Sequence, residues 1–256
     1  MSLLKVKHLQ KIYSTRFSSQ KVEALKDVSF DVEEGEYIAI MGESGSGKTT
    51  LLNILASLDK PTSGEVLLDG KDLTKISDKH ISAFRRDNLG FVFQDFNLLD
   101  TLTAYENIAL ALKILGVKAK KIDFRVRDVA KKLNISDVLN KYPYEISGGQ
   151  KQRVASARAI VTNPKLVLAD EPTGALDSNS SKMLLEGFQQ LNNDYQTTIL
   201  MVTHDAFSAS YASRVIFIKD GKIFNEFDRG NDSRKVFFER IIDVVSILGG
   251  DVNNVI

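Results

Sequence analysis

Short runs of apolar residues alternate along the chain with longer segments whose apolar residues recur at helical spacing. Three of these runs, Tyr37–Met41, Leu166–Ala169 and Ile199–Val202, are apolar throughout. That pattern is typical of parallel strands covered on both faces by helices. The sequence therefore predicts an α/β protein with a mainly parallel sheet. The strands we expect are Leu4–Leu9, Val28–Val32, Tyr37–Met41, Glu65–Leu68, Leu89–Phe93, Leu166–Ala169, Thr197–Val202 and Arg214–Lys219.

Helical periodicity dominates the middle of the chain. Ala104–Leu115 and Ile122–Leu133 space their apolar residues at intervals of three and four, which predicts amphipathic helices. We interpret residues of about 95–159 as a helical subdomain inserted into a sheet domain that spans residues 1–228. The Asp-Gly pair within Lys219–Lys222 predicts a β-hairpin, and the polar stretch Ser14–Lys21 predicts a loop.

The composition of the 256-residue chain excludes several classes of protein. Cysteine is absent, so the chain carries no disulfide scaffold and no thiolate metal site. Lys and Arg outnumber Asp and Glu by only 34 to 33, which provides no overall field to attract nucleic acid. No apolar run approaches the length that crosses a membrane, and the N-terminus lacks the apolar core of a signal peptide. We expect a soluble cytosolic protein.

A glycine-rich segment follows the run Tyr37–Met41. Residues 42–49 read Gly-Glu-Ser-Gly-Ser-Gly-Lys-Thr and fit the pattern G-x-x-x-x-G-K-[ST], and a helical run, Thr50–Leu58, comes next. Glycines let the backbone wrap so that successive N–H groups point at phosphate oxygens, and the helix N-terminus adds its dipole. In such a loop Lys48 reaches the β- and γ-phosphates and Thr49 ligates Mg²⁺. A glycine-rich turn that matches by chance is the alternative, and the flanking strand and helix argue against it.

Two carboxylates end another apolar run. Asp170 and Glu171 directly follow Leu166–Ala169. Because ligands bind at the carboxyl ends of parallel strands, both groups can converge on the Mg²⁺ and phosphate end of a nucleotide. We expect Asp170 to hold Mg²⁺ through water and Glu171 to orient or deprotonate the attacking water. Taken alone, such a pair can equally be a solvated loop start.

His204 and Gln94 stand at comparable places. His204 comes just after the run Ile199–Val202, beside the expected position of the γ-phosphate. Gln94 ends the run Phe91-Val-Phe and can reach a metal or a water. The other two histidines, His8 and His80, carry no such context, and we take them as structural.

A second glycine motif, Ser147–Gln150, precedes a helical run. Ser147 can cap the helical run Lys151–Ile160, and the Gly-Gly pair that follows it exposes N–H groups as a second anion site. The ordered motifs, with Tyr13 before them and Ala-Leu-Asp177 among them, resemble the nucleotide-binding subunit of ATP-binding-cassette (ABC) transporters over roughly residues 1–228. The resemblance implies a P-loop NTPase sheet core, an antiparallel β subdomain and an inserted helical subdomain.

The resemblance also implies a role for each matching residue. Glu171, His204, Gln94 and Lys48 would be catalytic, and Thr49, Gln94 and Asp170 would hold Mg²⁺. Tyr13 matches the aromatic residue that stacks on adenine, and the signature Ser147–Gln150 matches the segment that closes over ATP held by the other protomer. The ATP-binding residues implied are Tyr13, Gly42, Ser44, Gly45, Ser46, Gly47, Lys48, Thr49, Thr50, Ser147, Gly148, Gly149, Gln150 and Asp177.

Three departures from the family pattern stand out. Ile146 begins the signature where Leu is usual, which keeps its bulk. Ala175 replaces the usual Ser before Leu-Asp. The insertion Ser14–Lys21 makes Phe17 a rival to Tyr13 for contact with adenine.

The finer resemblance concerns the transported molecule. The stretch Phe93–Thr103, together with Gly174–Asp177, resembles the bacitracin and lantibiotic (antimicrobial peptide) resistance exporters, a branch related to macrolide-export and lipoprotein-release ATPases. It implies an ATPase homodimer, bound peripherally at the cytoplasmic face of the cell membrane to an integral membrane permease, with no nucleic-acid partner. The first alternative is an ATPase of a macrolide-export or lipoprotein-release type transporter. A non-transport ABC ATPase and a module that binds ATP without hydrolysing it are further alternatives.

The C-terminal residues 229–256 read as an amphipathic helical tail. After Asp232-Ser233, a suitable N-cap, seven apolar residues between Phe237 and Leu248 span about 160° of a helix, and Gly249-Gly250 would end it. Burial of so many apolar side chains is strongly favoured over their exposure to water. We expect a docked helix over about Ser233–Leu248, packed on the chain's own sheet domain, or alternatively on a second protomer or the permease.

Overall fold

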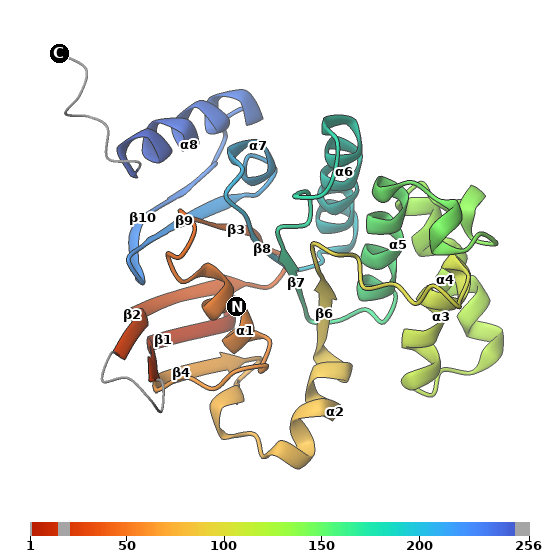
Figure 1. The fold of residues 1–256 in the computed structure, drawn as a ribbon, viewed down its shortest axis with the longest axis horizontal. Coiled ribbons are helices and arrows are strands. Elements are labelled where there is room, and N and C mark those ends of the chain that lie inside the picture. The colour runs from red at the N-terminus through yellow and green to blue at the C-terminus, as the bar shows by residue number, and fades with distance from the viewer. Residues whose placement is uncertain (1, 15–20, 249–256) are drawn as a thin grey trace. The chain divides into compact units, whose positions relative to one another are not determined.

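The computed structural model describes residues 2–14 and 21–248, and within these ranges the chain divides into two compact units (Figure 1). The first comprises Met1–Ile81 and Met201–Ile256, and the second comprises Ser82–Leu200. Phe17, most of the predicted loop Ser14–Lys21, and the Gly249-Gly250 pair lie outside the described residues. The α/β class predicted from the apolar runs is confirmed.

The first unit contains an antiparallel sheet in the order β2-β1-β4-β5. It also contains β10, β9 and β3 side by side, with the end of β8 next to β3. Strand β3 is buried along its whole length and pairs in parallel with β9. The strands and helices of this unit are β1 (Ser2–Ser14), β2 (Lys21–Glu33), β3 (Tyr37–Met41), α1 (Lys48–Leu55), β4 (Ser63–Leu68), β5 (Lys71–Asp72), η1 (Leu73–Lys75), α7 (Ala206–Ala209), β9 (Arg214–Lys219), β10 (Lys222–Asp228) and α8 (Arg234–Leu248), with α2 (Asp78–Asn88) beginning here.

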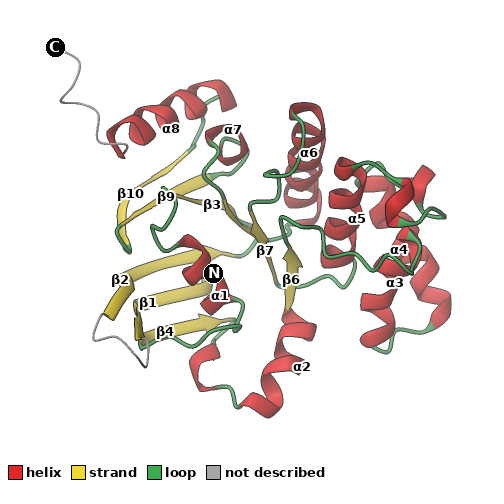
Figure 2. Cartoon of the chain, in the orientation of Figure 1, coloured by secondary structure: helices red, strands yellow, loops and turns green. Residues whose placement is uncertain are grey.

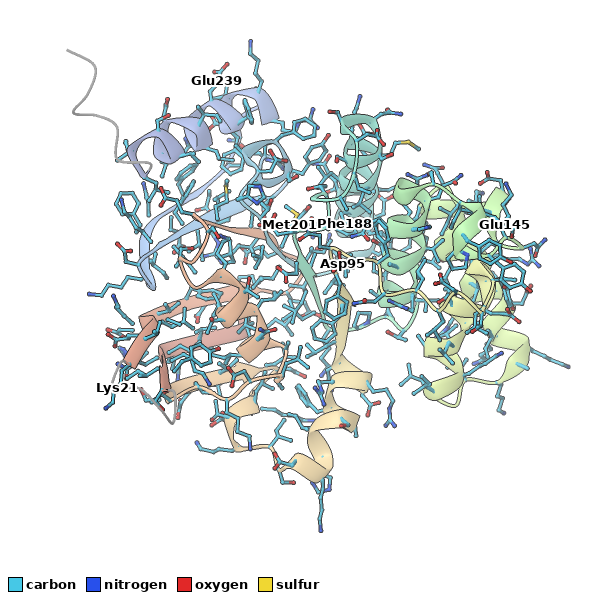
Figure 3. The ribbon with its side chains drawn as sticks, in the orientation of Figure 1. Lys21, Asp95, Glu145, Phe188, Met201 and Glu239 are labelled. Carbon is cyan, nitrogen blue, oxygen red and sulfur yellow. The ribbon has the colours of Figure 1, made fainter. Side chains whose placement is uncertain are left out.

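The second unit is mainly helical (Figure 2). Its strands β6 and β7 pair in parallel, and β7 neighbours the beginning of β8. Helices α3, α4, α5 and α6 pack together, and Phe188 of α6 is completely buried (Figure 3). The elements are β6 (Leu89–Val92), α3 (Ala104–Ile114), α4 (Ala119–Lys132), η2 (Ser136–Val138), η3 (Pro143–Glu145), α5 (Gly148–Ile160), β7 (Leu166–Asp170), α6 (Ser178–Tyr195) and β8 (Ile199–Val202).

Several predicted boundaries needed correction. Strands β1 and β2 are much longer than predicted, because their pairing continues through register shifts that break the apolar alternation. His8 and Asp27 have left-handed backbone angles, with φ of 48° and 61°, beside one of these shifts. Helix α1 begins two residues earlier than predicted, after Gly47, and the left-handed Ser57 lies beyond its end. Helices α2 and α6 were not among the predicted elements.

The hairpin prediction is confirmed. Strands β9 and β10 pair antiparallel across Asp220-Gly221, whose φ angles of 49° and 77° are the two positive values that a two-residue hairpin turn requires.

The C-terminal helix α8 packs on its own unit. Phe237, Ile241, Val244 and Leu248 are buried, and the Phe237 ring meets Phe227 of β10 edge-on, with centroids 5.6 Å apart. The Lys219 Nζ donates to the carbonyl oxygen of Leu248 at 2.9 Å, which fixes the end of the helix. Glu239 lies on the outer side of the helix (Figure 3). Within this single chain, the helix runs over Arg234–Leu248 and packs on its own unit.

The buried stripe of α8 is narrower than predicted. Of the seven apolar residues, Ile242 and Val245 remain 40% and 36% exposed. The reason is geometric, because a helix on one flat surface buries only the residues that face it, here one residue in three or four.

Candidate nucleotide-binding and signature sites

The glycine-rich loop between β3 and α1 follows a path that only glycine allows at two positions. Gly42 and Gly47 have φ of 156° and 109°. A Cβ atom on Gly42 would lie 2.2 Å from the carbonyl oxygen of Ile218, and one on Gly47 would lie 2.5 Å from that of Ala24. Gly45, with φ of 81°, has open space around it. The loop therefore packs tightly at its two ends and is open in its middle.

Lys48 lies inside this loop. Its side chain is buried, and Nζ donates to the carbonyl oxygens of Gly42 and Glu43 at 2.7 and 2.8 Å. The nearby Ser46 Oγ is buried and has no hydrogen-bond partner among the described residues. A buried ammonium and an unsatisfied hydroxyl within one glycine-rich loop fit an anionic ligand. These observations support the predicted phosphate cradle.

Thr49 and Thr50 lie in the first turn of α1, and Thr49 is exposed. His204 is also exposed and comes two residues after β8 ends. Asp205, beside it, caps α7 by accepting hydrogen bonds from the amides of Phe207 and Ser208, which holds the backbone at His204 in place.

Tyr13 lies near the end of β1, with 41% of its surface exposed. Its hydroxyl donates to Asp59 Oδ2 at 2.8 Å, and Lys11 Nζ donates to the other oxygen of the same carboxylate at 2.6 Å. Partial burial and this hydrogen bond raise the pKa of the Tyr13 phenol. Partial burial also raises the pKa of Asp59, but hydrogen bonds from Lys11 and Tyr13 outweigh it and hold that pKa below its ordinary value. The hydrogen bond thus holds the ring in one orientation, with Lys11 Nζ over it at 4.7 Å from the ring centroid.

In the second unit, Gln94 lies beside the segment that carries the acidic pair. Asp170 ends β7, and Glu171 follows with a left-handed φ of 43°. A Cβ atom on Gly174 would come within 2.9 Å of the Gln94 Nε2, so the turn after Glu171 packs directly against this glutamine. Left-handed backbone at a residue other than glycine is unfavourable, and such strained residues cluster at active sites and ligand-binding segments as well as in turns. The structure therefore brings together Gln94 and the segment that bears Asp170 and Glu171.

The predicted signature forms the start of α5. The Ser147 hydroxyl accepts from the amide of Gln150 at 3.2 Å, and the Gln150 side chain accepts from the amide of Ser147 at 3.0 Å. This reciprocal capping leaves Gly148 exposed at the helix N-terminus. Gly149 is buried, and a Cβ atom there would lie 2.4 Å from the Ser180 Oγ.

Asp177 caps the neighbouring helix α6. Its carboxylate accepts from the amides of Asn179 and Ser180 and from the Ser180 hydroxyl. These bonds, led by that from the hydroxyl, hold the pKa of Asp177 below its ordinary value. Because Gly149 packs on Ser180, the signature and Asp177 lie close to each other within the second unit.

Sequence reasoning missed the side chains that hold these elements. Asp59 and Lys11 orient Tyr13, and Gln152 and Arg158 of α5 bind the backbone around Gln94. Their partners lie 46 to 62 residues away along the chain, so no local pattern could have indicated them.

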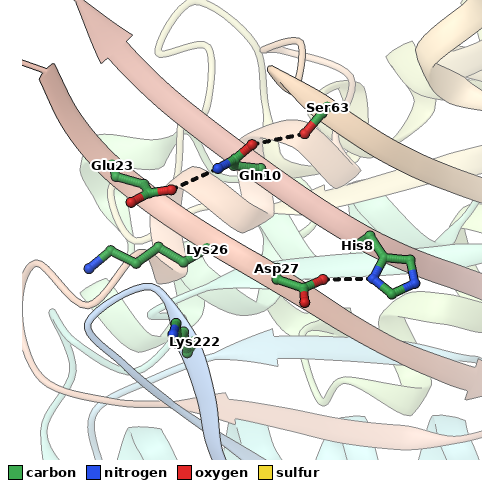
Figure 4. A pocket seen from close by; sticks show the side chains of 7 residues that line it. All are labelled: His8, Gln10, Glu23, Lys26, Asp27, Ser63 and Lys222. Carbon is green, nitrogen blue, oxygen red and sulfur yellow. Dashed lines mark hydrogen bonds and ion pairs between the residues drawn. The ribbon is translucent and has the colours of Figure 1, made fainter.

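The first unit also has a cleft of about 390 Å³ whose lining residues do not include the phosphate loop (Figure 4). His8 Nδ1 pairs with Asp27 at 2.7 Å, and Gln10 bridges Glu23 and Ser63. These five side chains bond to one another, and Lys26 and Lys222 complete the lining of the cleft. Within the described ranges, no group of three or more His, Asp or Glu side chains is arranged to hold a metal ion. None of the described helices combines the length and the apolar content that a membrane span requires.

Comparison with known proteins agrees with the motifs. A family model described as ABC transporter matches residues 25–174. The ABC transporter ATP-binding protein YxdL of Bacillus subtilis is 52% identical and covers 99% of this chain and 97% of its own. The bacitracin export ATP-binding protein BceA of Halalkalibacterium halodurans is 48% identical and covers 99% of this chain and 100% of its own.

Solved structures lead to the same family. The dimeric post-hydrolysis structure of the ATP-binding cassette MJ0796 of Methanocaldococcus jannaschii, bound to ADP and Pi, matches with a TM-score of 0.79 and 40% identity. The match covers 88% of this chain and 98% of that one. With its phosphate loop, acidic pair and signature in the family order, this chain belongs to the ABC transporter family as an ATP-binding subunit, and it is an ATPase.

Proposed function

We propose that this ATPase dimerises around two ATP molecules and powers an integral membrane permease that confers resistance to antimicrobial peptides such as bacitracin. The observation that carries the transport role is the 48% identity, over the whole of both chains, to a protein named for bacitracin export. The permease would hold the subunit at the cytoplasmic face of the membrane.

The first unit binds the nucleotide. Lys48, already turned into the loop toward the carbonyls of Gly42 and Glu43, pairs with the β- and γ-phosphates when ATP enters, and the loop amides bind the remaining phosphate oxygens. Adenine stacks on Tyr13, whose ring the Asp59 carboxylate holds in place. His204 contacts the γ-phosphate from the end of β8.

Thr49, Gln94 and Asp170 are the residues that would hold Mg²⁺. They offer a hydroxyl, an amide oxygen and a single carboxylate, which are the hard oxygen donors that Mg²⁺ prefers, with phosphate oxygens and water completing the shell. Because the set contains one carboxylate, it differs from an all-protein metal cage. When bound, Mg²⁺ would supply positive charge that neutralises the negative charge developing on the phosphates.

Glu171 orients the attacking water and accepts its proton. Its backbone turns left-handed directly after β7 ends, with φ of 43°. The packing of the following turn on Gln94 supports a common role for the two residues. Hydrolysis then follows the in-line course of phosphoryl transfer, in which positioning and charge stabilisation supply most of the catalysis.

The signature of one protomer covers the ATP of the other. Ser147 and Gly148 lie exposed at the N-terminus of α5, where amide groups and the helix dipole favour an anion. The dimeric cassette bound to ADP and Pi supports this arrangement. Asp177, beside the signature, would link the two ATP sites across the dimer.

The transport role can be tested in a bacterium that is sensitive to bacitracin and lacks related exporters. The subunit is expressed together with its candidate permease, as the wild type or as Glu171→Gln, and the minimal inhibitory concentrations of bacitracin, nisin and a macrolide are measured. We expect at least a fourfold rise for the peptides with the wild type and none with the variant. Protection against the macrolide alone, or equal protection by the variant, would overturn the proposal.

A further inference from the structure

The backbone that carries Gln94 has an irregular path. Phe93–Asn97 follows the end of β6, and Asp95 marks it in Figure 3. Phe96 and Asn97 both have left-handed φ angles, of 60° and 50°. Side chains other than glycine disfavour this region, so two such residues in succession persist only where the surroundings hold them.

Helix α5 holds this segment through two side chains. The Gln152 Nε2 donates to the carbonyl oxygen of Phe93 at 2.9 Å. The Arg158 guanidinium donates to the carbonyl oxygens of Phe96 and Asn97 at 3.1 and 2.6 Å. Three carbonyls of one irregular segment are therefore bound by the helix whose first turn is the signature.

The surroundings of the Gln152 side chain indicate that its hydrogen bond to Phe93 serves a purpose other than stability. The residue is completely buried, and its Oε1 has no hydrogen-bond partner among the described residues. Leaving a buried polar atom unsatisfied is unfavourable, and an apolar side chain of the same shape would avoid the loss. What the glutamine provides is the single bond from its Nε2 to Phe93.

The same segment continues from Asn97 to the start of α3, and this later part is held by a different side chain. Asn107 of α3, also completely buried, accepts from the amide of Leu99 and donates to the carbonyls of Leu99, Leu102 and Thr103. Only the portion nearest Gln94 thus relies on α5.

We propose that Gln152 and Arg158 are positioning residues that hold Phe93–Asn97 to the signature helix, so that Gln94 and Ser147 move as one body. The inference rests on the roles proposed above for Gln94 and the signature. A displacement of Gln94 on nucleotide binding or hydrolysis is then passed to the partner's ATP through α5, without any change within the helix itself.

Two variants test the link. Gln152→Met keeps the volume and helix propensity but removes both the donor and the unsatisfied oxygen. Arg158→Lys keeps the charge but lacks the planar fork that binds two carbonyls at once.

For Gln152→Met we expect a melting temperature equal to or above that of the wild type. Amide hydrogen exchange in residues 93–98 should be about fivefold faster, and kcat for ATP hydrolysis about tenfold lower. ATP affinity should stay within about twofold, because Lys48 and its loop are unchanged. Arg158→Lys should shift both exchange and kcat in the same directions.

Matched controls are Gln190→Met on α6 and Arg125→Lys on α4, both at exposed positions, which should change nothing. A lower melting temperature of Gln152→Met, with exchange faster throughout the unit, would make the residue structural and overturn the proposal. Unchanged exchange in 93–98, or faster exchange with a normal kcat, would overturn it as well. Failure of the proposed function would show elsewhere, as full ATP hydrolysis by Glu171→Gln.

Discussion

Replacing Phe237 with alanine should loosen the C-terminal helix from the sheet domain. The side chain is completely buried, meets Phe227 of β10 edge-on, and lies near the Arg240 guanidinium, which is 5.9 Å from its ring centroid. Arg240 itself also covers the Phe227 ring, at 4.6 Å. Phe237 therefore takes part in the contact between α8 and β10.

The magnitude follows from burial. Truncating a buried phenylalanine to alanine costs about 3–5 kcal/mol, including the loss of the ring pair. The four buried apolar side chains of α8 contribute roughly 6–12 kcal/mol before the entropy of ordering the helix is subtracted. Phe237 supplies a large share of that sum. We therefore expect α8 to detach before the rest of the unit unfolds.

Thermal melting and limited trypsin digestion at 25 °C measure the two consequences. The melting temperature should fall by roughly 6–20 °C if the full loss is felt globally, and by less if α8 detaches first. In either case trypsin should cut at Arg234 and Lys235 faster than in the wild type. The matched control is Phe124→Ala on α4, because Phe124 is 74% exposed. If Phe237→Ala melts within 1 °C of this control, on the order of measurement error, and is cut no faster, the reasoning about α8 is wrong.

Three further predictions concern the ATP site and the tail. Glu171→Gln should slow hydrolysis by about 10²–10⁴ through loss of the general base while ATP binding survives and a dimer accumulates on a sizing column; turnover above about a third of wild type would contradict this role. Lys48→Ala and Ser147→Arg should each be inactive alone, and mixing them should restore labelled-ATP binding at one composite site per dimer; equal binding and closure in a Ser147→Arg homodimer would exclude the signature from the site. Truncation after Asp228 should leave the catalytic residues in place but expose the surface that α8 covers, lowering solubility or melting temperature; an unchanged melting temperature and unchanged assembly with the permease would show that the tail is dispensable.

Elements whose cause is local could be predicted from the sequence. Tyr37–Met41 is apolar throughout because the strand is buried on both faces, and its bounds match the structure. The Ser147 cap depends on residues within one helical turn, and the turn at Asp220-Gly221 depends on two adjacent residues. The order of the motifs also placed the chain in its family, since a glycine-rich loop and an acidic strand end have the same chemistry in every protein with this fold.

Contacts between distant segments could only come from the tertiary structure. The left-handed backbone at His8 and Asp27 depends on how β1 and β2 pair. The register shifts there interrupt the alternation of apolar and polar residues, so the sequence did not indicate the full length of either strand. The width of the buried stripe on α8 depends on the surface beneath the helix, so Ile242 and Val245 could not be known to be exposed.

The same limit applies to the candidate site. The sequence alone indicated which residues are candidates to carry the chemistry, because Lys48, Glu171 and the signature are defined by short motifs. The tertiary structure decided what holds them. Gln152 and Arg158 reach carbonyls 59 to 62 residues away, and backbone carbonyls are the same at every residue, so nothing in the sequence marks them as partners. Only folding brings a particular carbonyl within reach of a particular donor.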